Sequence, residues 1–250
     1  MHRITMKMLS TLLAKFGYEV CKSTCTGELR WRTNPGWDAQ YIQKLGNPNT
    51  VIDVGVADGT PDLYAAFPEA YHILIDPLPM HEAAMKSYLA TYNGEYHICG
   101  LGPLESKQTI NVEVNSPGRS SFYKRTTASA SNSNIEEVEV QVRTLDGLMA
   151  QGDYQKPYLL KIDTEGFELE VIRGAKMTLI DTQYVIAEVS VVKRFNHSYH
   201  FAEFIEEMHA RGFRLYDILR VVRKPAINEV MILDAVFLNL NFERLEKSDV

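Results

Sequence analysis

The chain has 250 residues, of which 45% are hydrophobic and 23% charged, a composition typical of a folded globular protein and not of a disordered one. Its formal net charge of -6 at pH 7 argues against a nucleic-acid-binding protein, which usually presents a basic surface. No apolar stretch is long enough to span a bilayer. The three cysteines show no spacing typical of a zinc site, so we expect reduced thiols and a cytoplasmic protein.

The segment ahead of the first core strand has its own pattern. Four apolar residues recur there at helical spacing: Ile4, Met8, Leu12 and Leu13. This spacing predicts an amphipathic helix and not a signal peptide, because Lys15 interrupts the apolar stretch. Such a helix could cap a substrate site, touch a membrane surface or form a homo-oligomer, and the sequence leaves these alternatives open. We expect three parts: a helical segment 1–49, a main domain 50–242 and a tail 243–250.

Strands and helical patterns alternate along the main domain. Strands are expected at 51–54, 71–75, 95–99, 158–162, 184–189, 213–218 and 231–240. Helices are expected at 37–45, from about Pro61, and at 80–92, 167–180 and 201–211. This alternation predicts an α/β fold in which a mostly parallel seven-stranded sheet has helices on both faces. Because the last strand directly follows another strand, we expect an antiparallel strand at one edge.

The middle of the chain departs from this alternation. Residues 108–114 and 138–143 alternate apolar and polar side chains, which is typical of half-exposed strands. The tract 126–134 lies between them and is rich in small polar residues, so it is too poor in apolar residues to pack by itself. We expect a mobile loop there, either a lid or a plain hairpin tip.

The turn after the first core strand indicates a ligand site. It holds two acids and two glycines, Asp53, Gly55, Asp58 and Gly59. Open α/β sheets bind ligands at the carboxyl ends of their strands, and Gly55 would let the backbone approach the ligand. The two acids would repel a diphosphate and favour positive charge. The turn therefore indicates a nucleotide-like ligand with a cationic end, such as S-adenosylmethionine, and an ordinary capped turn is the alternative.

Asp76 adds a partner for ribose to this site. It ends the second strand, 23 residues after Asp53, about where an acid binds ribose hydroxyls in nucleotide-binding α/β folds. NAD is the natural competitor as a ligand. However, its fingerprint G-x-G-x-x-G needs a middle glycine, whereas this turn has Ala57 and Asp58 before Gly59. That difference disfavours an NAD-dependent oxidoreductase.

Three further acids stand at the carboxyl ends of two later strands. Asp163 ends one strand and Glu165 follows it, while Glu188 stands near the end of the next strand. All three are expected at the same edge of the sheet as Asp53 and Asp76. They could supply a general base for an alcohol, or oxygen ligands for Mg²⁺ or a similar ion. Solvated acids without a catalytic role are the alternative.

Several motifs resemble those of FkbM-type methyltransferases. The run Lys161-Ile162-Asp163-Thr164-Glu165-Gly166, with 168–175 after it, resembles the hallmark of that family. The segment 51–59 resembles the first motif of class I S-adenosylmethionine-dependent enzymes. Further matching motifs stand in the family's order: Ser120-Ser121-Phe122, Val142-Arg143-Thr144-Leu145-Asp146 and Ile186-Ala187-Glu188-Val189. The resemblance covers about 50–240.

This resemblance implies a Rossmann-like class I methyltransferase fold and methyl transfer to a hydroxyl oxygen, often on a sugar, glycan or natural product. It implies that Asp53, Gly55 and Gly59 form the cofactor turn, that Asp76 holds the ribose, and that the 163–165 acids sit beside the transferred methyl. The candidates for the base are Asp163, Glu165, Glu188 and His197.

Three alternatives stay open at this point. In a metal-assisted variant, Asp163 and Glu188 would hold a divalent ion such as Mg²⁺ that acidifies the acceptor hydroxyl. Direct base catalysis needs no metal ligand. A protein that keeps the fold and the cofactor site without turnover is the third alternative.

Overall fold

The computed structural model describes residues 18–20, 29–31, 36–126, 134–224 and 226–243. Contacts divide the chain into two units, residues 1–36 and 37–250. In the first unit, β1 (Tyr18–Val20) pairs antiparallel with β2 (Leu29–Trp31). The amphipathic helix expected near the N-terminus lies outside the described residues. The domain boundary expected at residues 49 and 50 falls inside the second unit.

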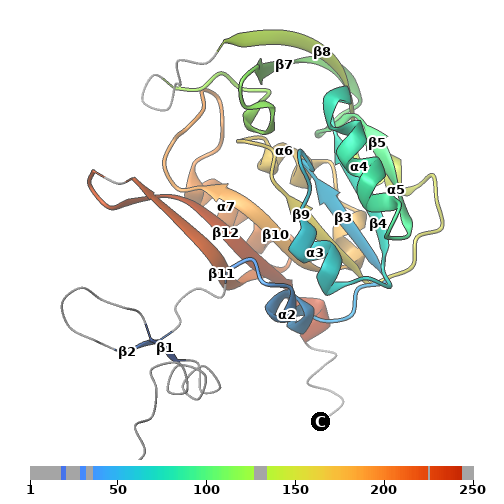
Figure 1. Cartoon of the computed structure of the whole chain (residues 1–250), viewed down its shortest axis with the longest axis vertical. Coiled ribbons are helices and arrows are strands. Elements are labelled where there is room, and N and C mark those ends of the chain that lie inside the picture. The colour runs from blue at the N-terminus through green and yellow to red at the C-terminus, as the bar shows by residue number, and fades with distance from the viewer. Residues whose placement is uncertain (1–17, 21–28, 32–35, 127–133, 225, 244–250) are drawn as a thin grey trace, which may run out of the picture. The chain divides into compact units, whose positions relative to one another are not determined.

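A seven-stranded sheet forms the centre of the second unit (Figure 1). Its strands are β3 (Thr50–Val54), β4 (Tyr71–Asp76), β5 (Gly94–Ile98), β9 (Tyr158–Ile162), β10 (Thr182–Ser190), β11 (Phe213–Lys224) and β12 (Glu229–Asn239). They lie in the order β11-β12-β10-β9-β3-β4-β5. The pairs between β10 and β5 are all parallel, while β12 is antiparallel to both of its neighbours. The predicted mostly parallel seven-stranded sheet is confirmed.

The antiparallel strand lies one place in from the edge, which corrects its predicted position at the edge. Strand β11 ends at Lys224 and β12 begins at Glu229, so β12 pairs with β11 as a hairpin and inserts between β11 and β10. Residues 235–238 of β12 are all buried, as expected of an interior strand. Strand β11 carries exposed charged side chains, including Arg220 and Arg223, which suit an edge that must not pair further.

Helices cover both faces of the sheet, as predicted. One face packs against α2 (Ala39–Ile42), α3 (Pro61–Ala66) and α4 (Glu82–Leu89), and the other against α5 (Leu145–Met149), α6 (Glu168–Arg173) and α7 (Phe201–Ala210). Short 3₁₀ turns are η1 (Gln43–Leu45), η2 (Pro79–His81), η3 (Pro117–Arg119) and η4 (Thr178–Asp181). Strand β3 contributes to the core on both faces of the sheet, because successive strand side chains point to opposite faces. Val51 packs on the face covered by α2, α3 and α4, and Ile52 packs on the face covered by α5, α6 and α7. No helix in the described ranges is long and apolar enough to cross a membrane.

An inserted sheet of three strands lies between β5 and α5. It consists of β6 (Gly100–Leu101), β7 (Ser106–Glu113) and β8 (Ile135–Arg143), in the order β6-β8-β7. The antiparallel pairing of β7 and β8 confirms the two half-exposed strands expected there. Most of the small polar tract expected between them, residues 127–133, lies outside the described residues. The segment from η3 to Phe122 reaches the carboxyl end of the main sheet, where it lines a cavity.

Candidate active site

The turn that follows β3 is built around two glycines with left-handed backbone. Gly55 has φ +78°, and a Cβ atom there would lie 1.7 Å from the Asp163 carbonyl oxygen. Gly59 has φ +101°, and a Cβ atom there would lie 2.0 Å from a ring carbon of Tyr88. Both positions therefore require glycine for conformation and for space. The sequence predicted that Gly55 lets the backbone approach a ligand closely. In the structure, the close neighbour of Gly55 is the backbone of Asp163, directly after β9.

Asp53 lies beneath this turn and does not line the cavities at the sheet edge. Its side chain is fully buried, and Oδ2 accepts a 2.6 Å hydrogen bond from the Tyr64 hydroxyl. Oδ1 lies 3.0 Å from Lys161 Nζ, which also donates a 2.9 Å hydrogen bond to the Gly55 carbonyl oxygen. Asp53 thus acts on the turn through Lys161.

Lys161 is a functional residue that the sequence reasoning did not single out. It is only 5% exposed in an otherwise apolar buried strand, where a charged residue needs a partner. Burial alone would lower the pKa of Lys161, but the charges of Asp53 and Asp163 outweigh it and raise that pKa. The signal was present in the sequence, because a lysine interrupts the apolar run 158–162.

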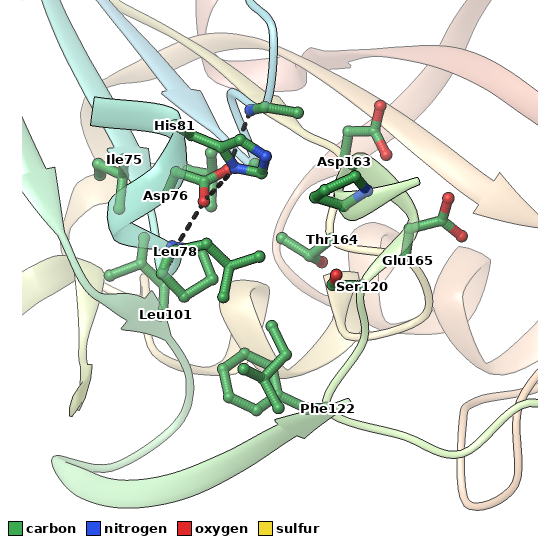
Figure 2. A pocket seen from close by; sticks show the side chains of 18 of the residues that line it. Ile75, Asp76, Leu78, His81, Leu101, Ser120, Phe122, Asp163, Thr164 and Glu165 are labelled. Atoms are coloured by element: carbon green, nitrogen blue, oxygen red, sulfur yellow. Dashed lines mark hydrogen bonds and ion pairs between the residues drawn. The ribbon is translucent and has the colours of Figure 1, made fainter. Parts of the chain in front are cut away.

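Asp76 ends β4 and accepts hydrogen bonds from the 55–59 turn and from the residues that follow β4 (Figure 2). Its Oδ2 accepts from the Ala57 backbone N–H at 2.9 Å, and its Oδ1 accepts from the Leu78 N–H at 2.9 Å. The imidazole of His81 lies 2.8 Å from Oδ1 through Nδ1. The carboxylate is therefore fixed in place, and the sequence reasoning missed His81 as its partner.

A first cavity extends from Asp76 to Asp163 (Figure 2). Its apolar lining comes from both sheets and includes Leu78, Leu101, Ile110 and Phe122. Its polar lining includes Asp76, His81, Ser120, Asp163, Thr164 and Glu165. An apolar end suits a base, an acid beside it suits ribose hydroxyls, and an acidic far end suits positive charge. These residues fit S-adenosylmethionine.

A second cavity lies on the other side of the 55–59 turn. It is lined by the turn itself, by Lys161 and Asp163, and by Glu188, Arg220 and Asp234 from the neighbouring strands. Asp58, the exposed acid of the turn, faces this cavity. Gly55, Ala57, Gly118 and Asp163 line both cavities, so the two meet beside Asp163.

Asp163 is the acid that both cavities share. Its carboxylate lies 3.9 Å from Lys161 Nζ, and 36% of its side-chain surface is exposed. The protein atoms packed around the rest of the side chain disfavour its charged form, and this partial desolvation raises the pKa of Asp163 to about 6. Lys161 lowers the same pKa, while Glu165 raises it.

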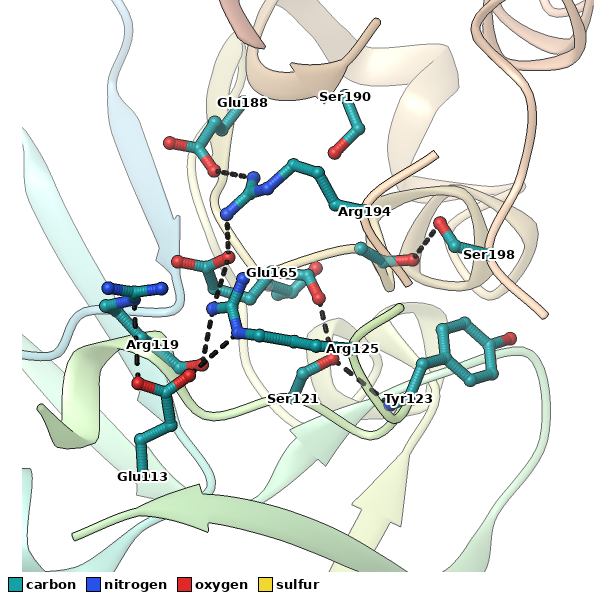
Figure 3. A network of polar contacts seen from close by, with 12 residues as sticks. Glu113, Arg119, Ser121, Tyr123, Arg125, Glu165, Glu188, Ser190, Arg194 and Ser198 are labelled. Atoms are coloured by element: carbon teal, nitrogen blue, oxygen red, sulfur yellow. Dashed lines mark hydrogen bonds and ion pairs between the residues drawn. The ribbon is translucent and has the colours of Figure 1, made fainter. Parts of the chain in front are cut away.

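Glu165 is held by two arginines (Figure 3). Its Oε2 lies 2.5 Å from Arg194 Nη2 and 3.2 Å from Arg125 Nη2, and its side chain is 11% exposed. Both guanidinium groups also lie over the ring of Phe195, at 4.6 Å for Arg125 and 5.2 Å for Arg194. Arg125 in addition bonds Glu113 of the inserted sheet at 2.8 Å. Glu165 is thus part of an ion-pair network that ties the inserted sheet to the main sheet.

Glu188 is held in the same way from the other side. Its Oε2 lies 3.2 Å from Arg194 and its Oε1 lies 3.1 Å from Arg220. Burial, and then the charges of Asp163 and Glu165, raise the pKa of Glu188, whereas Arg194 lowers it. The structure therefore brings Asp163, Glu165 and Glu188 together at one edge, as the sequence predicted, but it gives two of them arginine partners.

The insertion of β12 explains the partners on this side. Asp234 of β12 is directly opposite Glu188 of β10, and Arg220 of β11 is opposite Asp234. Arg220 Nε bonds Asp234 Oδ2 at 2.6 Å, and the Trp37 indole N–H bonds the same oxygen at 2.6 Å. A cation between two facing carboxylates removes the repulsion that like charges on neighbouring strands would cause.

The structure places a predicted candidate, His197, away from the cavities, and it gives a structural role to Glu168, which was not a candidate. His197, a predicted base candidate, is exposed and lines neither cavity. Glu168 is 1% exposed and accepts hydrogen bonds from the backbone N–H groups of Thr164 and Gly166, at 3.0 and 2.9 Å. The Tyr199 hydroxyl donates to it as well, at 2.7 Å. Glu168 therefore fixes the loop that carries Asp163 and Glu165.

The donor set at this edge does not fit the divalent metal of the metal-assisted variant. Within the part of the chain that the structure describes, no group of three or more His, Cys, Asp or Glu side chains could hold a metal ion. Glu188 is already bonded to Arg194 and Arg220, and Lys161 lies beside Asp163. Both oxygens of Glu188 are therefore engaged by guanidinium groups, and Lys161 would repel an ion placed beside Asp163.

The sheet, the glycine turn and the acidic strand ends together define an α/β protein with two cavities at the carboxyl edge of its sheet. The chain belongs to the methyltransferase FkbM domain family, whose sequence model matches residues 53–215. A curated relative, Methyltransferase 1 of Beauveria bassiana (strain ARSEF 2860), is 23% identical in an alignment 181 residues long that covers 65% of this chain and 71% of the relative.

Two solved structures are similar in fold at low identity. One is an O-methyltransferase from Bacillus cereus in complex with SAH, with TM-score 0.46, 11% identity, and coverage of 80% of this chain and 78% of that chain. The other is a precorrin-6y C5,15-methyltransferase from Geobacter metallireducens GS-15, with TM-score 0.41, 6% identity, and coverage of 80% and 84%. The family assignment confirms the Rossmann-like class I fold and the S-adenosylmethionine-dependent methyltransferase family predicted from the motifs.

Proposed function

We propose that this protein transfers the methyl group of S-adenosylmethionine to a hydroxyl oxygen of a sugar, glycan or natural product. The observation that carries the proposal is the environment of Asp163. It lines both cavities, its pKa is raised to about 6, and among the described residues no arginine pairs with it. A carboxylate of raised pKa beside a cofactor site is suited to take a proton from an alcohol.

The proposed cofactor residues follow from the linings of the two cavities. Leu78 and Leu101 would pack against the adenine, Asp76 would bind the ribose, and the 55–59 turn with Asp58 would receive the amino-acid end. Asp53 would support that turn through Lys161 instead of touching the ligand. When bound, S-adenosylmethionine supplies an electrophilic methyl group on a positively charged sulfur.

The chain's own residues then have separate roles in the reaction. Asp163 would accept the hydroxyl proton as the new oxygen–carbon bond forms and the sulfur–carbon bond breaks. Glu165 and Glu188 are less suited to this role because arginines already occupy their oxygens. Ser120 and Phe122 of the inserted segment would help keep water from the site. Positioning supplies much of the acceleration in such an in-line displacement.

Cofactor binding is the first test. Calorimetric titration with S-adenosylmethionine, S-adenosylhomocysteine and NAD should give binding of the first two and none of NAD. Binding of NAD alone would contradict the proposal and support the oxidoreductase alternative.

Methyl transfer is the second test. The protein is incubated with S-adenosylmethionine labelled in its methyl group and with panels of monosaccharides, nucleotide sugars and phenolic natural products. We expect the label on a hydroxyl oxygen of at least one class, located by mass spectrometry and NMR. Label found only on nitrogen or carbon would overturn O-methyl transfer. Cofactor binding without transfer to any acceptor would support the catalytically silent alternative.

A further inference from the structure

The carboxylate of Asp76 is nearly saturated before any ligand arrives. A carboxylate offers about four acceptor positions, two on each oxygen. Oδ1 already accepts from the Leu78 N–H and from His81, and Oδ2 accepts from the Ala57 N–H. Only one position, on Oδ2, is left. A ribose brings two hydroxyl donors, so Asp76 alone has no place for the second one.

His81 has an acceptor to offer at the same place. Its Nδ1 lies 2.8 Å from Asp76 Oδ1, and since an ionised carboxylate only accepts, Nδ1 carries the hydrogen. In the neutral ring, Nε2 is then an acceptor. The side chain is 9% exposed and lines the first cavity, and no described residue bonds to Nε2. Figure 2 shows the ring beside the Asp76 carboxylate, with its second nitrogen turned away from that carboxylate.

The local backbone fixes this arrangement. Asp76 ends β4, and the His81 backbone N–H donates a 3.0 Å hydrogen bond to the Leu78 carbonyl oxygen, closing the η2 turn. The Leu78 N–H is in turn anchored on Asp76 Oδ1. Carboxylate and imidazole are therefore presented together, five residues apart in the sequence, at the end of a buried strand.

We propose that His81 is a second ribose-binding residue, whose Nε2 accepts one ribose hydroxyl while the open position on Asp76 Oδ2 accepts the other. This inference rests on the cofactor site of the proposed function, but not on the identity of the acceptor or of the base. It assigns the 2′- and 3′-hydroxyls to two different side chains, which makes their contributions separable by experiment.

The test is a thermodynamic double-mutant cycle in which one change removes the His81 side chain and the other removes one hydroxyl of the ligand. The affinities of S-adenosylhomocysteine and of its 2′-deoxy and 3′-deoxy analogues are measured by calorimetry at pH 8.5 and again at pH 9.5. Both values are well above the usual histidine pKa of about 6.5, because the hydrogen bond with Asp76 raises the pKa of His81 and Nε2 accepts only in the neutral ring. In the wild-type protein each analogue should bind more weakly. In His81→Phe, the affinity ratio between S-adenosylhomocysteine and one of the analogues should be about tenfold smaller than in the wild type, as expected for the loss of one hydrogen bond. The other analogue should keep its wild-type ratio.

A purely structural role for His81 gives a different result. It would weaken S-adenosylhomocysteine and both analogues by the same factor, and such unchanged ratios would overturn the inference. His81→Asn is measured alongside, in case the phenylalanine disturbs folding, and should show the same selective loss. His97→Phe is the matched control, because His97 bonds Glu95 at 2.9 Å and does not line the cavity. Failure of the wild type to bind S-adenosylhomocysteine would overturn the cofactor proposal as well, so the two failures are distinguishable.

Discussion

The two halves of the carboxyl edge of the sheet use the same residue type in different ways. At β3 and β4, Asp53 and Asp76 are bonded to a tyrosine, a lysine, backbone N–H groups and a histidine. At β9 and β10, Glu165 and Glu188 are each bonded to two arginines. The first half presents carboxylates that shape a ligand pocket. The second half locks carboxylates into a network that holds the inserted sheet.

Asp163 is the exception that gives the comparison its meaning. It belongs to the second half by position, yet its nearest described cation is Lys161 at 3.9 Å, which belongs to the first half by its bonds to Asp53 and Gly55. An acid that stands between the two networks keeps its oxygens available for a ligand. Position on the sheet edge therefore does not determine the role of an acid; its partners do.

The largest expected effect comes from removing this exceptional acid. Asp163→Asn should lower the rate of methyl transfer by about 10²- to 10⁴-fold, the usual contribution of a general base. Affinity for S-adenosylhomocysteine should stay within about threefold, because this product lacks the positively charged sulfur that the acidic end of the first cavity would face. Rates are measured in single turnovers with labelled S-adenosylmethionine and an acceptor found in the panels. An unchanged rate would remove Asp163 from the reaction.

The second network should be tested by unfolding. Arg194→Gln should lower the free energy of unfolding by about 3 kcal/mol, because it leaves two buried carboxylates each with one partner fewer. Urea titration measures the change. Arg173→Gln is the control, because Arg173 is 37% exposed and its partners Glu170 and Glu203 are 19% and 46% exposed, so its loss should stay below about 1 kcal/mol. Equal losses in the two variants would contradict a structural role peculiar to the Arg194 network.

The first network should be tested by ligand affinity. Asp76→Asn should weaken binding of S-adenosylhomocysteine by about 1–3 kcal/mol, because a charged acceptor for ribose is lost and the partners on Oδ1 and Oδ2 are disturbed. Calorimetry measures the change. Glu82→Gln is the control. The Glu82 carboxylate bonds Lys86 of α4 and Tyr96 of β5, and Glu82 does not line the first cavity. Unaltered affinity in Asp76→Asn would show that the ribose is held elsewhere.

Much of this architecture could be predicted because it depends on local patterns. Buried parallel strands such as 51–54 and 158–162 are near-continuous apolar runs, and acids that follow them must meet at one edge of the sheet. The position of β12 could not be predicted in the same way, because pairing between strands is not local. The alignment of Glu188, Asp234 and Arg220 on neighbouring strands could not be predicted either, because it depends on the position of β12. This alignment places Arg220 within ion-pair distance of Glu188.

The partners of the individual acids could not be predicted from the sequence for the same reason. Arg125 and Arg194 lie 40 and 29 residues from Glu165, and only the folded chain brings them to it. Asp53 and Asp76 stand at the same edge, yet one is fully buried and the other lines a cavity. The role of the N-terminal helix, oligomer formation and the cytoplasmic location stay predictions.

The smallest expected effect concerns pH, and it tests the link between the two networks. Asp163 must be deprotonated to accept a proton, so the rate should rise with pH, reach half its maximum near the Asp163 pKa of about 6 and then level off. Lys161 lowers that pKa, so Lys161→Met should move the rising limb to higher pH, whereas Lys161→Arg, which keeps the charge, should leave it nearly in place. The profile is measured at saturating cofactor and acceptor, so that weaker binding does not mimic the shift. A limb that stays in place in Lys161→Met, with the protein folded, would mean that the two halves of the edge act independently.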